Sequence, residues 1–195
     1  MGAGYSEVQI YNMVLDHLEE ESAATINDLR APVKWLNRNF PIHRDALLRK
    51  GMWGFARKRM TVVRDTTNPP FEWNYRYAMP GDLLRLLPYT YASRTGYTPY
   101  QYHIEGSFIL ANITSPANLL YIRRVSTTGD FDSLFTLALA SRLALAMAHW
   151  MTGKNSYVES LRYIHERELN DALEVDQVEN NFQTPYDDEF LLARE

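Results

Sequence analysis

Cysteine is absent from the 195 residues of the chain. This absence excludes disulfide bonds and thiolate metal ligands within the chain, and it favours folding in a reducing compartment. Residues 1–5 also lack the basic start and apolar run of a secretory signal, so we expect synthesis and folding in the cytoplasm. Met1 and Gly2 leave two alternatives: a myristoylation site with Ser6 at its later position, or a start methionine that is simply removed.

The sequence motifs of common enzymes are missing as well. There is no glycine-rich phosphate loop and no G-x-S-x-G nucleophile elbow, and the five histidines never occur at a ligand spacing such as H-E-x-x-H. We therefore predict no enzymatic activity, no cofactor and no metal site. One alternative stays open, because the many acidic residues could place two carboxylates at the spacing of a cell-wall or polysaccharide hydrolase.

What the chain does contain is typical of a folded, water-soluble protein. Hydrophobic residues make up 46% and charged residues 23% of the sequence, close to the averages for globular domains. A chain of this length forms one domain, or one core with a smaller appendage.

The charges are strongly segregated along the chain. Residues 30–64 include ten basic residues and one acidic residue, a net charge of +9, whereas residues 154–195 include four basic and eleven acidic residues, a net charge of −7. Copies that meet side by side could therefore set an acidic face against a basic face. Two alternatives remain: ordinary solvated helix faces, or a basic surface for nucleic acid with interleaved aromatic residues. Those aromatic residues are Trp35, Phe40, Trp53 and Phe55.

Two helices are predicted in the first third of the chain. Ser6 and Gln9 form a capping box, and Tyr11 and Leu15 then recur at helical spacing on an apolar face. A second helix is predicted to open at Pro32 and to end at Gly51. Pro41 should kink or split it.

Strands are predicted between residues 61 and 125, where the apolar pattern has a period of two. We expect an aromatic strand over 71–77, then Asp82 as the cap of a short helical turn over 83–85. Strands over 102–104 and 107–111 flank a turn at Glu105 and Gly106, and a third strand covers 119–125. Residues 89–102 form a tyrosine-rich loop, in which we expect Tyr97 and Tyr100 to touch a partner.

The last third is predicted to hold two long helices and a tail. An apolar helix over 134–151 is capped by Asp130 or Asp132, and Arg142 near its middle argues against a membrane span. A second capping box, Ser156 with Glu159, opens a helix over 157–178. Beyond it we expect an extended tail whose apolar side chains dock on another protein. The partner-binding residues predicted there are Tyr186, Phe190, Leu191 and Leu192.

The order of several short motifs resembles the phage tail tubular protein A family, the head-to-tail adaptors of short-tailed phages. The matching segments are Trp53-Gly54-Phe55-Ala56, Met79-Pro80-Gly81-Asp82-Leu83-Leu84-Arg85, Tyr102-His103-Ile104-Glu105-Gly106, Leu119-Leu120-Tyr121-Ile122, Phe131-Asp132-Ser133-Leu134-Phe135 and Ala140-Ser141-Arg142-Leu143-Ala144. The similarity spans about residues 5–178. It does not extend to the loop over 89–102 or to the tail.

The resemblance implies an α+β subunit that is mainly a helical bundle, with N-terminal helices packed on two long C-terminal helices and a small antiparallel β insertion in the middle. The expected division is 1–60 and 127–180 for the bundle, 61–126 for the insertion and 181–195 for the tail. It further implies a virion protein, made in the host cytoplasm, that forms a dodecameric ring between the portal and the tail nozzle. Double-stranded DNA would pass through this ring without sequence-specific binding, and no membrane is involved. The acidic last helix or the tail would line the channel, or the tail would dock on the portal.

Overall fold

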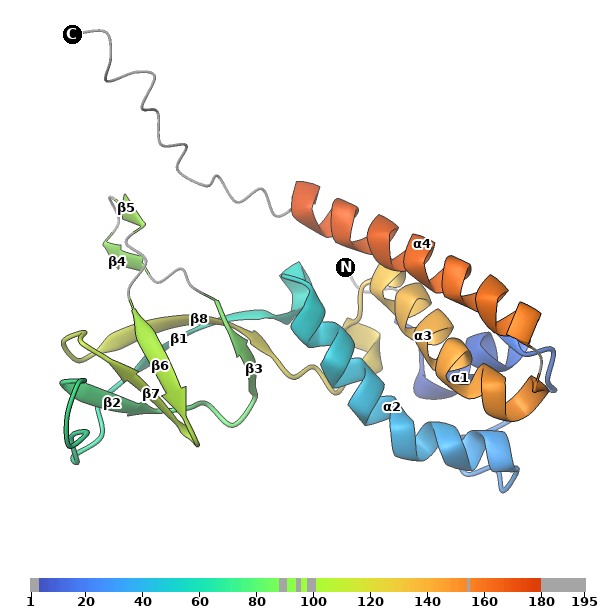
Figure 1. Ribbon diagram of the computed structural model, residues 1–195, viewed down its shortest axis with the longest axis horizontal. Helices are drawn as coiled ribbons and strands as arrows, with labels where there is room; N and C mark the ends of the chain where they lie inside the picture. Colours follow the sequence, from blue (N-terminus) through green and yellow to red (C-terminus); the bar gives the residue numbers. More distant parts are fainter. Residues whose placement is uncertain (1–3, 88–90, 94–95, 98–100, 154, 180–195) are drawn as a thin grey trace, which may run out of the picture. The chain divides into compact units, whose positions relative to one another are not determined.

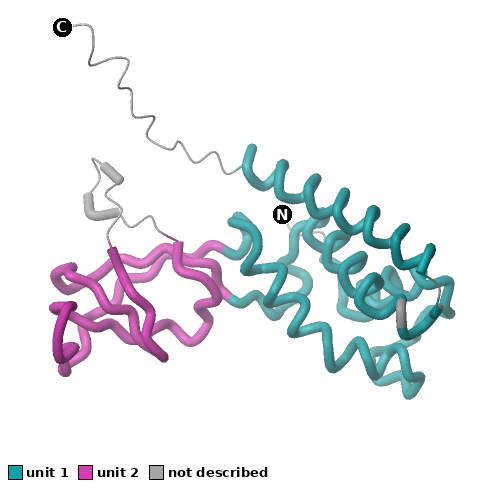
Figure 2. Tube along the Cα trace, in the orientation of Figure 1, with its two compact units in different colours: residues 1–56, 124–179 teal, residues 57–123, 180–195 magenta. Residues whose placement is uncertain are grey.

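The computed structural model describes residues 4–87, 91–93, 96–97, 101–153 and 155–179 (Figure 1). Contacts divide the chain into two compact units (Figure 2). Residues up to 56 together with 124–179 form the helical unit, and residues 57–123 form the sheet unit.

The helical unit consists of four α-helices, one of which packs against the other three. The elements are α1 (Glu7–His17), α2 (Ala31–Lys50), α3 (Ser133–Thr152) and α4 (Asn155–Glu179), with short 3-10 turns η1 (Gly54–Ala56) and η2 (Thr128–Asp130). Helix α3 packs against each of the other three, and it runs between α2 and α4 in Figure 1. This position explains its composition, because a helix covered on several sides has little surface left for polar residues. Its buried alanines, Ala138, Ala140, Ala144 and Ala148, let the neighbouring helices approach closely.

The ends of α1 and α3 follow local side-chain chemistry. The capping box is confirmed: the Ser6 N–H donates to Gln9 Oε1 at 2.8 Å, and the Gln9 N–H donates to Ser6 Oγ at 3.4 Å. Asp132 caps α3, since its Oδ1 accepts from the Leu134 N–H at 2.8 Å. The second capping box is wrong, because α4 already begins at Asn155 and Ser156 lies inside its first turn.

Helix α2 begins and ends where the sequence predicted, with Pro32 in its first turn and Gly51 as its C-cap. It is not split at Pro41. An internal proline costs about 3 kcal/mol, but Leu36 and Phe40 are buried before it and Leu47 and Leu48 after it, which holds both turns against the core.

An aromatic cluster follows α2 and joins it to the start of α3. Trp53 is 1% exposed, and its indole N–H donates to the Leu47 carbonyl at 3.0 Å. The ring of Phe135 meets the rings of Trp53, Phe55 and Phe131 edge-on, each at a centroid distance of 5.1 Å. The Trp53-Gly54-Phe55-Ala56 motif is therefore part of the core of the helical unit.

The sheet unit contains two three-stranded antiparallel sheets, in the orders β1-β8-β3 and β2-β7-β6, and a two-stranded pair β4-β5. The strands are β1 (Arg57–Val62), β2 (Tyr75–Ala78), β3 (Leu83–Leu86), β4 (Tyr91–Ser93), β5 (Gly96–Tyr97), β6 (Tyr102–Glu105), β7 (Phe108–Ala111) and β8 (Ala117–Arg123). The predicted turn is present but lies one residue later, at Gly106 and Ser107, because Glu105 still pairs with Phe108. Gly106 has a φ of 56°, which favours glycine. The two three-stranded sheets share one buried cluster that includes Val62, Tyr77, Ile109 and Tyr121.

Two strand predictions are wrong. Residues 83–85 are strand rather than helical turn, because Leu83–Leu86 pairs with β8. Asp82 is occupied elsewhere, accepting from the Tyr121 hydroxyl at 2.8 Å and from Lys58 Nζ at 2.7 Å. The aromatic strand is shorter than expected, since Glu72 has a φ of 68° that breaks the extended backbone, and Phe71 is 77% exposed outside it.

These observations correct the expected fold class. The described part of the chain is a mixed fold of four α-helices and two three-stranded antiparallel sheets, not mainly a helical bundle with a small β insertion. The physical reason is that residues 57–123 bury a hydrophobic cluster of their own and so form a unit rather than an appendage. None of the described helices is sufficiently long and apolar to cross a membrane.

Candidate functional site

The helical unit has helices of opposite charge. Helix α2 has a net charge of +4, and its exposed charged side chains are all basic: Lys34, Arg38, Arg49 and Lys50. Its single acidic residue, Asp45, is half-buried between Arg44 at 2.7 Å and Arg124 at 2.7 Å. Helix α4 has seven acidic and two basic residues, a net charge of −5, and exposes Glu159, Glu166, Asp171, Glu174 and Glu179.

The central helix keeps most of these charges apart within one molecule. Helices α2 and α4 each pack on α3 and lie on either side of it (Figure 1). The turn η1, which follows α2, meets α4 near the end of that helix, where the Gly54 N–H donates to Asp176 Oδ1 at 2.8 Å. The exposed charged side chains of α2 are all basic, whereas α4 exposes mainly acidic side chains together with Arg162 and Arg167. The helical unit therefore carries helices of opposite net charge on either side of α3.

Large apolar side chains lie exposed among these charges. Ile42 on α2 is 65% exposed, and Tyr163 and Val178 on α4 are 68% and 79% exposed. An isolated exposed apolar residue needs no explanation. Apolar residues on both charged helices, however, supply the contact area that charge pairs alone do not.

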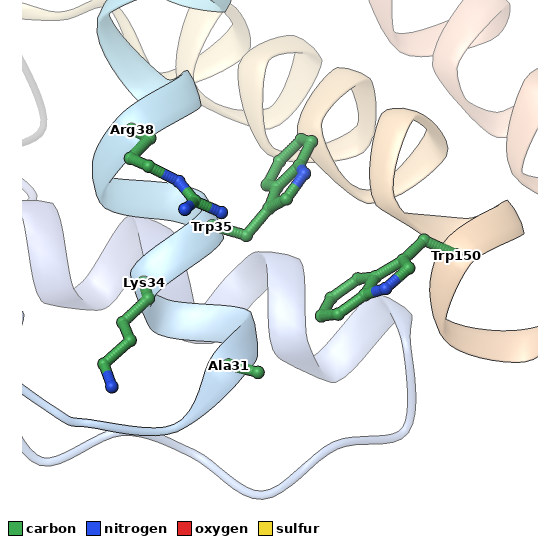
Figure 3. Close-up of a pocket in the computed structure, with 5 residues that line it drawn as sticks. All are labelled: Ala31, Lys34, Trp35, Arg38 and Trp150. Carbon is green, nitrogen blue, oxygen red and sulfur yellow. The ribbon is translucent and has the colours of Figure 1, made fainter.

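A surface hollow of about 550 Å³ opens beside the basic helix (Figure 3). We name it the tryptophan hollow; it is lined by Ala31, Lys34, Trp35 and Arg38 of α2 and by Trp150 of α3. The two indoles extend into the space between their helices, with Arg38 turned toward Trp35 and the Lys34 side chain directed away from both indoles. Trp150 is 55% exposed, whereas Trp35 is half-buried and its ring also meets that of His43 at 6.0 Å.

The chemistry of the hollow points to binding rather than catalysis. Indole faces attract apolar groups and cations, and flanking Lys and Arg side chains attract carboxylates and phosphates. Tryptophan and arginine are also the residues most often found at the energetic centres of protein interfaces. A ligand with both an apolar and an anionic part fits this lining.

Trp35 stood out in the sequence only as one of the aromatic residues of the basic segment, and Trp150 was not singled out. A signal was present: Arg142 is the one charged residue of α3, and Ala146 and Trp150 follow it at intervals of four residues. Residues at such spacing share a helix face. Ala146 is indeed exposed like Trp150, and Arg142 is half-buried.

Titratable groups are also buried between the helices. The Ser141 hydroxyl and His165 Nδ1 lie 3.2 Å apart, and both residues are buried. Burial lowers the pKa of His165, and the charges of Arg142 and Lys50 lower it further. Burial likewise lowers the pKa of His43, with Arg142 adding to the effect. The hydroxyl–imidazole pair is enclosed by the core, so it stabilises the packing of α3 on α4 and does not meet a substrate.

Within the described ranges, no three His, Cys, Asp or Glu side chains gather in a way that could hold a metal ion. The predicted partner-binding residues fall mostly beyond what the structure describes. Tyr186, Phe190, Leu191, Leu192 and Tyr100 lie outside the described residues. Tyr97 is in strand β5, where its backbone pairs with Tyr91, and its side chain is not described. All six therefore stay predictions.

Comparison with known proteins adds no assignment. No protein-family model matches the chain, and no curated protein is significantly similar to it. Function must be argued from the charged helices and the tryptophan hollow.

Proposed function

We propose that this protein is a structural subunit that assembles side by side with its own copies, as a head-to-tail adaptor ring does. In this proposal the ring sits in the virion between a portal and a tail nozzle, and duplex DNA passes through it. The observation that supports self-assembly is the placement of basic α2 and acidic α4 on either side of α3.

The sign of the charges selects the type of contact. A twofold contact centred on the exposed face of either helix would bring α2 onto α2 or α4 onto α4, which sets like charges together. Contact of α2 with the α4 of a neighbour sets unlike charges together. It leaves a free α4 at one end of the pair and a free α2 at the other. Repeating it gives a closed ring if the rotation closes and a filament if it does not.

The proposal also fits passage of DNA without capture. The chain has a net charge of −4, and strongly basic linings are what hold phosphate backbones. In this proposal the basic side chains of α2 face one neighbouring copy, and α4 faces another. Helix α4 therefore does not line the channel.

Charge reversal with complementation tests the contact. One variant reverses α2 (Arg49→Glu with Lys50→Glu), and another reverses α4 (Glu166→Lys with Glu174→Lys). Each variant alone should assemble less than wild type, because the exchange lowers the net charge of α2 from +4 to 0, or changes that of α4 from −5 to −1, and sets like charges together at the exchanged positions. An equimolar mixture should recover assembly, because reversed α2 meets reversed α4 and the native surfaces meet each other.

Light scattering after size exclusion and electron microscopy, with the chain alone and with a portal protein, measure assembly. A matched control, Glu72→Lys with Glu105→Lys, places the same charge change on exposed residues of the sheet unit and should assemble as wild type does. A wild type that stays monomeric at high concentration and beside a portal would contradict the proposal. So would hydrolysis of cell wall or polysaccharide that one carboxylate-to-amide change abolishes.

A further inference from the structure

We infer that the tryptophan hollow receives residues 186–192 of a neighbouring copy in the assembly. The inference rests on the proposed self-assembly and names a second contact for it, separate from the α2–α4 contact.

The segment matches the hollow in chemistry. Residues 186–192 read Tyr-Asp-Asp-Glu-Phe-Leu-Leu, so three consecutive carboxylates stand between an aromatic residue and three apolar residues. Lys34 and Arg38 offer partners for the carboxylates, and the indoles of Trp35 and Trp150 offer an apolar surface for Phe190 and its neighbours. Unlike charges across a contact set the register, and buried aromatic anchors supply most of the affinity.

Distance favours a neighbouring copy over the same molecule. Trp150 lies near the end of α3, close to the start of α4, whereas the segment follows the far end of α4. The 25 residues of α4 span roughly 37 Å at 1.5 Å per residue. Residues 180–187 can extend at most about 29 Å and residues 180–192 at most about 47 Å. Within one molecule only an almost fully extended tail could therefore bring Phe190 to Leu192 to the hollow, and Asp187 would then fall short of Lys34 and Arg38. A neighbour has no such restriction.

Nucleic acid is the competing ligand for a surface of two tryptophans and two basic residues. Surfaces for single strands follow the backbone with a continuous basic groove and stack several bases in succession. Along α2 the exposed basic side chains are interrupted by Pro41 and Ile42, the latter 65% exposed. The hollow therefore matches a short acidic and apolar peptide better than a run of phosphates.

A labelled synthetic peptide of residues 180–195 provides the test. Its binding to the full-length chain is measured by fluorescence anisotropy, at protein concentrations below those that give assembly. We expect saturable binding that Trp150→Ala weakens by about tenfold or more, as for an anchor residue. Lys34→Glu with Arg38→Glu should weaken it similarly, and a peptide with Phe190→Ala and Leu191→Ala should bind poorly to wild type.

Matched controls separate the hollow from general charge and fold effects. Arg49→Glu with Lys50→Glu makes the same charge change at the other end of α2 and should leave peptide binding within about twofold of wild type. Circular dichroism checks that Trp150→Ala keeps its fold, which its exposure predicts. Tyr163→Ala, which removes another exposed aromatic from α4, should have no effect on the peptide.

The outcomes also distinguish the two proposals. The inference is overturned if the peptide does not bind, or if Trp150→Ala and Lys34→Glu with Arg38→Glu leave its binding unchanged. Charge-reversal complementation can still succeed in that case. Displacement of the peptide by a short thymidine oligonucleotide, with tighter binding of the oligonucleotide, overturns it in favour of nucleic acid. If the charge-reversed variants fail to complement each other but the peptide still binds at the hollow, only the α2–α4 contact is overturned.

Discussion

Replacing Gly51 with alanine should destabilise the helical unit for a reason that is purely steric. Gly51 ends α2 with φ −97° and ψ 177°, a conformation that any residue can adopt. A Cβ at this position would lie 2.4 Å from Trp53 Cε2 and 2.7 Å from Trp53 Nε1. Because Trp53 is 1% exposed and packed against Phe135, the ring has no free space into which to retreat.

The magnitude follows from three contributions. Overpacking a well-packed core costs about 1 to 3 kcal/mol. Moving the indole also strains its hydrogen bond to the Leu47 carbonyl, and an unpaired buried donor costs about 1 to 3 kcal/mol. Alanine recovers about 0.4 to 1 kcal/mol by restricting the unfolded chain. We expect a net loss near 3 kcal/mol, which lowers Tm by roughly 6 to 12 °C in a chain of this size.

Urea and thermal unfolding, followed by helical ellipticity, measure the effect. Gly129→Ala is the matched control in the same unit, because a Cβ there meets no described heavy atom within 4 Å; it should leave stability unchanged or raise it slightly. In a Trp53→Phe background the smaller ring should reduce the cost of Gly51→Ala. Equal stabilities of the Gly51→Ala and Gly129→Ala proteins would refute the steric argument.

Two further predictions concern helix capping and pH. Ser6→Ala should cost about 1 kcal/mol of unfolding free energy through loss of the α1 cap, whereas Ser156→Ala should change it by less than about 0.5 kcal/mol; urea titrations in which the two variants lose equal stability would contradict this difference. The pKa values of His43 and His165 are lowered from the usual 6.5 in the folded chain, so near and below pH 6.5 the unfolded chain binds more protons than the folded chain does. The free energy of unfolding should therefore fall from pH 7 toward pH 5. The His43→Asn with His165→Asn variant should show a flatter profile, and a profile as steep as that of wild type would assign the dependence to other groups.

Interactions within a few residues were predictable from the sequence. The Ser6–Gln9 capping box, the Asp132 cap and the hairpin turn that follows Glu105 depend on atoms close together in the chain. The structure confirms both caps and places the turn one residue later than predicted. The predicted capping box at Ser156 is wrong although it rests on the same kind of local pattern. Helix α4, which packs on α3, already begins at Asn155, before the predicted cap.

Long-range pairing explains the errors in the sheet unit. Asp82 looked like a helix cap because such residues commonly cap helices, but Tyr121 and Lys58, which lie far from it in sequence, take its carboxylate. Pairing with β8 then makes Leu83–Leu86 a strand. The candidate site shows the same limit: Trp35 was found in its basic segment, while its partner Trp150 was hidden in an apolar helix.

The sequence by itself determined the composition of each surface: a basic α2, an acidic α4, an apolar α3 and an acidic, apolar segment after residue 180. These properties depend only on which residues follow one another. Tertiary structure decided that α3 separates the charged helices and that Trp150 meets Trp35 and Arg38 in one hollow. It also decided that residues 57–123 bury a cluster of their own. Such placements arise from packing among residues distant in the chain, and local sequence patterns do not specify them.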